Sequence, residues 1–145
     1  MTNYTKPKSG WSLLSTNSTK TMKGEKYGYT TYIMYLAPAK QNSKGIDLCP
    51  FRTKGCTKAC LYTSGMGIFS NVQKARINKT NFYVENRKEF LQRLFKEVGN
   101  KQKLHKKRGT KFCIRLNGTS DINFLKQKIE GKNIFQTFFY LMVSY

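Results

Sequence analysis

Two short stretches of the chain are rich in the aromatic and β-branched residues that pleated strands favour. The first covers residues 27–36, and Pro38 marks its end because proline cannot donate a ladder hydrogen bond. The second covers residues 111–116, which read Lys-Phe-Cys-Ile-Arg-Leu. We therefore expect two strands, with Cys113 as a small core residue of the second.

Between these stretches, apolar residues recur at helical spacing over residues 90–98. This spacing predicts a helix with one side facing the core. Asn86 and Glu89 have the arrangement of a capping box at its start. Gly99 follows the last periodic residue, so we expect the helix to end there.

Two shorter helices complete the expected set. One begins at an N-cap on Ser70 and runs to about residue 80, and the other follows residues 120–121 and runs to about residue 129. The resulting order is strand, loop, helix, strand, loop, helix. That order predicts an α/β fold in which right-handed βα units surround a parallel sheet.

The length of 145 residues leaves room for a single domain. Residues 1–26 are rich in Ser, Thr, Asn and Lys, which predicts a loosely ordered lead-in to an α/β domain over residues 27–145. Within that domain, residues 40–67 contain Gly, Cys and Pro without any periodicity. They predict a long Cys-rich loop, and ordered loops of that length are usually functional.

A membrane partner is not expected, because the longest apolar run, Phe138 to Val143, is too short to span a bilayer. The first eight residues are polar and no apolar stretch follows them, so they do not resemble a secretory signal. A reducing, cytosolic location is therefore the expectation, and disulfide bonds are not favoured there.

The net charge of +20 attracts polyanions, of which nucleic acid is the commonest in a cell. No acidic residue lies between Glu97 and Asp121. Two interpretations stay open for the basic residues of this segment: contact with a phosphate backbone, or a solvated basic loop. The candidate nucleic-acid residues are Lys101, Lys103, Lys106, Lys107, Arg108 and Lys111.

Three of the four cysteines, Cys49, Cys56 and Cys60, lie within twelve positions of one another in the predicted loop. Thiolates bind zinc and iron–sulfur clusters tightly, so this spacing predicts a metal centre. Lys54 and Lys58 are expected to lower the thiol pKa values. The alternatives are a disulfide with a spare thiol, or three buried cysteines that bind no metal.

The number of cysteines leaves the identity of the metal open. A structural zinc ion usually has four protein ligands, and His105, the only histidine, is the candidate fourth ligand. Three thiolates without a fourth ligand would instead suit a [4Fe-4S] cluster with one open iron, to which a substrate or cofactor could bind.

Two loops are candidates for binding a cofactor. Gly65 and Gly67 precede the helix predicted at Ser70, where backbone N–H groups can face an anion, although a plain turn explains them equally well. The second loop follows the second strand, at the edge of a parallel sheet where ligands often bind, and a capped turn is its alternative. It comprises Asn117, Gly118, Thr119, Ser120 and Asp121.

Several short motifs, in this order, resemble the bacteriophage family called gene product 88. They are Leu36-Ala37-Pro38, Cys49-Pro50, Gly55-Cys56, Ala59-Cys60-Leu61, Ser64-Gly65-Met66-Gly67, Ala75-Arg76, Lys79-Thr80 and residues 115–122. The resemblance implies a phage or prophage gene whose product works in the host cytoplasm, and it brings no activity with it.

The layout also resembles the opening of a radical S-adenosylmethionine barrel, in which a three-cysteine loop follows the first strand. This resemblance implies that Cys49, Cys56 and Cys60 hold a [4Fe-4S] cluster and that residues 117–121 face the methionine part of S-adenosylmethionine. Members of the gene product 88 family are longer, and the sequence after Gln136 does not continue as expected. We therefore expect a truncated or frame-shifted product and a partial barrel.

Two hypotheses follow. The first is an iron–sulfur enzyme of a phage, of the radical type. The second is a basic nucleic-acid-binding protein whose loop is closed by a structural zinc ion. The sequence does not decide whether the protein is an enzyme, and it does not indicate an oligomeric state.

Overall fold

The computed structural model describes residues 11–16, 22–129, 131–134 and 136, and the chain forms two compact units. Unit 1 comprises residues 1–11, 35–87 and 117–122, and unit 2 comprises residues 12–34, 88–116 and 123–145. The first ten residues and residues 17–21 of the predicted lead-in lie outside the described part, as do residues 137–145, on which the expected truncation bears.

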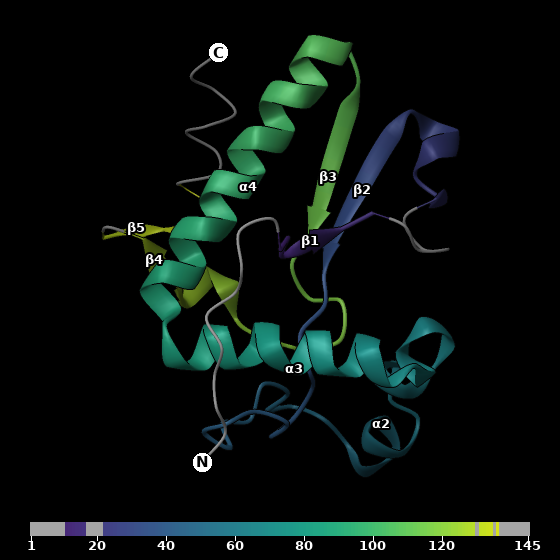
Figure 1. Cartoon of the computed structure of the whole chain (residues 1–145), viewed down its shortest axis with the longest axis vertical. Helices are drawn as coiled ribbons and strands as arrows, with labels where there is room; N and C mark the ends of the chain where they lie inside the picture. Colours follow the sequence, from purple (N-terminus) through teal and green to yellow (C-terminus); the bar gives the residue numbers. More distant parts are fainter. Residues whose placement is uncertain (1–10, 17–21, 130, 135, 137–145) are drawn as a thin grey trace. The chain divides into compact units, whose positions relative to one another are not determined.

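Unit 2 contains a mixed three-stranded sheet in the order β1 (Leu14–Ser15), β2 (Tyr29–Met34) and β3 (Lys111–Arg115) (Figure 1). Strands β2 and β3 are parallel, with Tyr29 opposite Lys111, whereas β1 pairs antiparallel to β2. Both predicted strands and the α/β class are confirmed. The expected parallel pairing holds for β2 and β3, but the sheet as a whole is mixed, because a segment of the predicted lead-in supplies the antiparallel edge strand β1.

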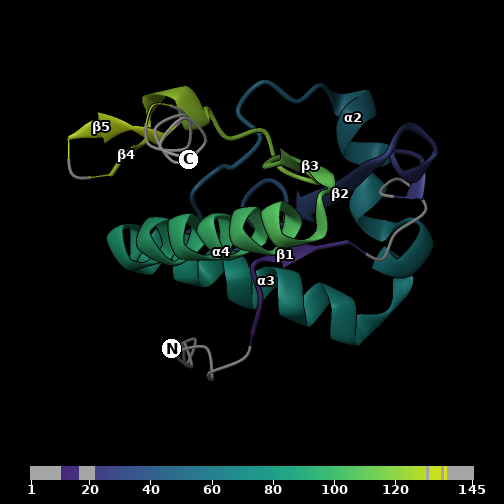
Figure 2. The same ribbon diagram turned by 90° about the horizontal axis from the view of Figure 1, so that it is seen from above.

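Helix α4 (Arg87–Arg108) lies against one face of β2 and β3 (Figure 2). Alternation along the strands turns Tyr32 and Phe112 toward the helix. The imidazole of His105 stacks on the Phe112 ring at 5.0 Å between centroids and meets the Tyr32 ring edge-on at 5.7 Å. These aromatic contacts fix the end of the helix on the sheet.

The predicted end of α4 at Gly99 was wrong, because the helix continues for nine more residues. It stops at Gly109, whose φ of 63° is a left-handed conformation that glycine adopts without steric cost. The N–H of Gly109 donates to the Lys106 carbonyl at 3.3 Å, and the N–H of Thr110 donates to the His105 carbonyl at 3.0 Å. This is a Schellman motif, which satisfies the last carbonyl groups of the helix.

Strand β1 is attached to α4 through one carboxylate. Glu97 accepts hydrogen bonds from the backbone N–H groups of Leu13 and Leu14 at 2.9 to 3.2 Å and from the hydroxyl of Ser12 at 2.9 Å. Leu13 is 0% exposed, so its N–H group has no access to water and needs this acceptor.

The Cys-rich segment of unit 1 contains short helices instead of a continuous loop. These are α2 (Lys54–Lys58), η2 (Leu61–Thr63) and η3 (Gly65–Ile68). The following helix, α3 (Ser70–Glu85), starts one residue earlier than predicted, with Phe69 instead of Ser70 at the N-cap position, and it extends beyond residue 80. Its buried side includes Arg76, Lys79 and Thr80 as well as apolar residues, a polar content that periodicity of apolar residues cannot reveal.

The helix expected over residues 121–129 was wrong. The segment instead forms the short η4 (Phe124–Lys126) and a hairpin of β4 (Lys128–Ile129) and β5 (Lys132–Asn133), with η1 (Glu25–Tyr27) as the remaining short helix of unit 2. Gly131, with a φ of 80°, lies between the two strands. Among the helices in the described residues, none combines the length and hydrophobicity of a membrane-spanning segment.

Candidate functional site

Unit 1 contains all three cysteines of the predicted metal centre, and none of the four cysteines of the chain forms a disulfide. Cys49 and Cys60 are half-buried, and Cys56 is exposed. Cys113 belongs to unit 2 and is exposed, so its prediction as a core residue was wrong. Strand alternation explains the error, because Phe112 and Ile114 take the side of β3 that faces α4.

Backbone groups surround the sulfur atom of Cys49. The N–H of Ala39 lies 3.5 Å from this sulfur, and the N–H of Leu48 donates to the Ala39 carbonyl at 3.0 Å. Ala39 has a φ of 53°, a left-handed conformation that costs a non-glycine residue roughly 1 to 2 kcal/mol. The chain therefore holds a strained residue at the point where it contacts the cysteine.

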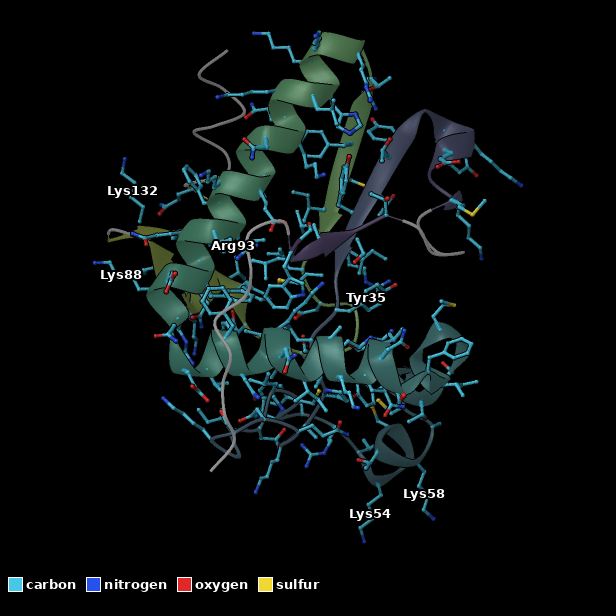
Figure 3. The ribbon with its side chains drawn as sticks, in the orientation of Figure 1. Tyr35, Lys54, Lys58, Lys88, Arg93 and Lys132 are labelled. Carbon is cyan, nitrogen blue, oxygen red and sulfur yellow. The ribbon has the colours of Figure 1, made fainter. Side chains whose placement is uncertain are left out.

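Burial and backbone hydrogen bonding act in opposite directions on the pKa of the Cys49 thiol. Burial raises the pKa of its thiol, the negative charges of Asp47 and Cys60 add to that rise, and the N–H groups of Ala39 and Asp121 oppose it. This is the reverse of the lowered pKa that the lysines predicted. Lys54 and Lys58 project from α2 away from unit 1, which explains why they contribute little (Figure 3).

Arg52 connects Cys49 to the start of α2. Its Nη1 donates to the carboxylate of Asp47 and, at 3.1 Å, to the carbonyl of Cys49. The guanidinium lies within electrostatic range of the thiols of Cys49 and Cys56. Cys56 itself donates its N–H to the hydroxyl of Thr53, the N-cap of α2, at 3.1 Å. A fixed positive charge thus lies near two of the thiols.

Arg76 is a buried cation beside the third thiol. Its side chain is 8% exposed, and the Nη1 donates to the Tyr62 carbonyl at 3.1 Å. The guanidinium carbon lies 4.9 Å from the ring centre of Tyr35 and 5.4 Å from that of Tyr62. Burial lowers the pKa of Arg76, while the neighbouring tyrosines and Cys60 raise it. Its buried Nε has no hydrogen-bond acceptor among the described residues.

The same side of α3 buries two further polar residues. Lys79 is buried, with its ammonium 5.6 Å from the ring centre of Trp11. The hydroxyl of Thr80 accepts from the N–H of Ala37 at 2.7 Å and donates to the carbonyl of Arg76 at 2.8 Å. The spacing of positions 76, 79 and 80 places all three on one helix face, but the sequence does not show that this face is buried.

The loop of residues 117–121 lies next to Cys49. The N–H of Asp121 donates to the Leu48 carbonyl at 2.9 Å, and the hydroxyl of Thr119 donates to the carbonyl of Leu36. Asn117 bonds to the backbone of Ile122 through both ends of its amide and accepts from Ser120 at 3.1 Å. Most of the polar side chains therefore hold the loop together, and the carboxylate of Asp121 is exposed.

Gly65 and Gly67 lie in η3, directly before α3. The N–H of Gly67 donates to the carbonyl of Ser64 at 3.0 Å, so this amide is already used within the chain. A Cβ atom at Gly67 would lie 2.0 Å from the Tyr62 carbonyl oxygen and 3.0 Å from Nη1 of Arg76. Gly67 thus has a packing role, because it allows η2 and η3 to approach closely.

No group of three or more His, Cys, Asp or Glu side chains in the described part of the chain is arranged to hold a metal ion. Cys49 and Cys60 are close enough for their charges to interact, whereas Cys56 lies on the exposed helix α2. The structure thus brings two of the three predicted ligands near each other, beside Asp121 and Arg76.

His105, the candidate fourth zinc ligand, lies in helix α4 of unit 2 and not in a basic loop. Its Nε2 is 3.0 Å from the Tyr32 hydroxyl and its Nδ1 is 2.7 Å from the Thr110 hydroxyl. Both ring nitrogens therefore have partners. The basic residues around it also belong to α4, apart from Lys111, which begins β3.

Acidification is expected to destabilise unit 2 through His105. Burial, then Arg108 and Lys101, lower the pKa of His105, which is 4% exposed. Below pH 6.5 the unfolded chain therefore binds a proton that the folded chain resists, and stability falls as the pH is lowered. Urea unfolding between pH 7.5 and 5.5 should show this loss (roughly the range of histidine titration). His105→Gln should be less stable throughout but independent of pH there; an equal dependence in both proteins would contradict the assignment.

Comparison with known proteins gives a match to a family model. The family model described as Gene product 88 matches residues 11–140, which is most of the chain. Neither a curated protein nor a solved structure matches the chain.

Proposed function

We propose that this chain, which belongs to the Gene product 88 family, carries an iron–sulfur centre in unit 1 that is held by Cys49, Cys56 and Cys60. The observation that carries the proposal is the buried guanidinium of Arg76 beside Cys60. A buried cation is costly without a nearby negative charge. No ion pair in the described part of the chain involves Arg76. A cluster with three thiolate ligands carries net negative charge and would supply the compensation.

The surroundings of Cys49 also support a thiolate ligand. Backbone N–H groups of Ala39 and Asp121 favour the charged form of its sulfur, and hydrogen bonds to the sulfur atoms are one of the means by which proteins tune such clusters. Helix α2 is exposed along its whole length, so Cys56 can move toward the other two thiols with little loss of buried contact. In this proposal metal binding and closure of the Cys-rich segment occur together, as is common for metal sites.

Three protein ligands would leave one iron of a [4Fe-4S] cluster open to an exchangeable cofactor. The loop of residues 117–121 meets Cys49, so a cofactor on that iron, such as S-adenosylmethionine, would lie beside the exposed Asp121. A parallel pair such as β2–β3 is also what the first two strands of a partial barrel would form. On these grounds we favour a radical-type enzyme that acts in the reducing cytoplasm of the host.

The alternative is a structural zinc ion in a nucleic-acid-binding protein. Zinc sites of that kind usually have four protein ligands, and both nitrogens of His105 are bonded elsewhere. The donor set of unit 1 therefore suits a cluster with an open iron better than closed tetrahedral zinc.

Metal analysis of anaerobically prepared protein tests the proposal. We expect a brown protein with iron and acid-labile sulfide in equal amounts, and a strong loss of both in Cys49→Ser, Cys56→Ser and Cys60→Ser. Cys113→Ser is the matched control, because it removes an exposed thiol of unit 2 and should keep the full iron content. Stoichiometric zinc would favour the alternative, and a colourless protein without either metal would refute both.

A further inference from the structure

The side of β2 and β3 opposite α4 forms a partly open sheet face. Alternation along the paired strands places Tyr29, Thr31, Ile33, Lys111, Cys113 and Arg115 on this side, which we call the open face. Ile33 is buried and Thr31 is half-buried, whereas the other four residues are exposed. A sheet normally buries at least one face, and here α4 supplies that cover, so the open face is available to a partner.

Two exposed tyrosine rings lie at or just before the start of β2. Tyr29 is 40% exposed, and Tyr27, which ends η1, is 80% exposed. The ammonium of Lys111 lies 5.6 Å from the ring centre of Tyr29, its partner in the parallel register. Exposed aromatic rings next to cations suit the binding of a nucleotide, because its base can stack on the ring and its phosphate group can form an ion pair with the cation.

The charge around the open face is almost entirely positive. The open face carries Lys111 and Arg115 and no acidic residue, and the segment just before β2 adds Lys23 and Lys26 with one acidic residue, Glu25. Lys106, Lys107 and Arg108 are exposed in the last turn of α4, directly before the turn into β3. Such a concentration of positive charge favours a polyanion as the partner.

We infer that the open face of unit 2 binds single-stranded nucleic acid. A duplex keeps its bases stacked inside, so phosphate contacts alone would use the lysines and arginines but leave the two tyrosines without a role. A single strand presents both its bases and its phosphate groups to a flat sheet, as in other sheet-based binding surfaces. The inference concerns unit 2 and does not depend on a metal in unit 1.

Fluorescence anisotropy with labelled homopolymers of deoxythymidine and of uridine, at two or more salt concentrations, tests the inference on the full chain. In the double variant Lys111→Gln/Arg115→Gln we expect about tenfold weaker binding and a salt slope that is smaller by about 1.4, which is roughly 0.7 for each lost phosphate contact. Lys88→Gln/Lys132→Gln removes the same charge from two exposed positions of unit 2 that are not on the open face (Figure 3). This control should bind within about twofold of the original chain.

Substitution of the two tyrosines is the second test of the inference. Tyr27→Ser/Tyr29→Thr should weaken single-strand binding by about tenfold or more with an unchanged salt slope, since stacking contributes roughly 1 to 3 kcal/mol per base. A preference for one homopolymer would identify DNA or RNA as the ligand and support the inference in either case. Equal losses in the two charge variants, tyrosine variants that bind normally, or no binding at low salt would each overturn it.

Discussion

Replacing Gly67 with alanine is expected to destabilise unit 1 by about 3 kcal/mol or more. The added Cβ would lie 2.0 Å from the carbonyl oxygen of Tyr62, a distance that no rotation of a side chain can relieve. The backbone of η2 or η3 would have to shift, and the Tyr62 carbonyl would leave Nη1 of Arg76. The buried guanidinium would then lose a hydrogen bond as well.

Gly65→Ala is the matched control for this variant. Gly65 has a φ of 55°, so alanine is strained there, but no heavy atom lies within 4 Å of the added Cβ. Its cost should be about 1 kcal/mol. Urea unfolding can be followed by the fluorescence of Trp11, the only tryptophan, which packs near Phe82 in unit 1. If the two glycine variants lose the same stability, the close approach of η2 and η3 is not the cause.

Replacing Glu97 with alanine is expected to cost unit 2 about 3 kcal/mol, because backbone donors at Leu13 and Leu14 would lose their acceptor. Both leucines are buried, so water cannot replace the carboxylate without disturbing the core. Strand β1 should detach from α4 before the rest of the unit unfolds. Hydrogen exchange at the amides of Leu13 and Leu14 measures this detachment directly.

Two controls define what Glu97 contributes. Glu97→Gln keeps one acceptor oxygen and should lose clearly less stability than the alanine variant. Lys96→Ala changes an exposed neighbour on the same helix, and it should remain within about 0.5 kcal/mol of the original chain. Unchanged amide protection in Glu97→Ala would show that β1 is held by its apolar side chains alone.

The sequence was informative where local chemistry decides the structure. Runs of aromatic and β-branched residues identify β2 and β3, and helical spacing identifies α4. The end of α4 was missed because Gly99 has the composition of a helix stop, whereas packing of His105 on the sheet continues the helix to the true stop at Gly109. Tertiary contacts overrode a local preference at that position.

The candidate site was only partly visible in the sequence. The spacing of the cysteines singles out Cys49, Cys56 and Cys60, and all three lie in unit 1. The importance of Arg76 was missed, because arginine on a helix normally faces solvent and nothing local indicates its burial. Likewise, the contact of Ala39 with Cys49 depends on a left-handed backbone conformation of Ala39. The residue type gives no sign of this conformation, because alanine rarely adopts it.

Both compact units are assembled from separated stretches of chain, and the boundary between them is crossed after residues 11, 34, 87, 116 and 122. Any contiguous fragment long enough to contain β2 and β3 also contains the cysteines, and any cut between the cysteines and residue 117 divides both units. Deletion mapping would therefore remove iron binding and nucleic-acid binding together, even if the two were chemically unrelated. For this protein, roles can be assigned to individual units by point substitutions in the intact chain, but not by truncation.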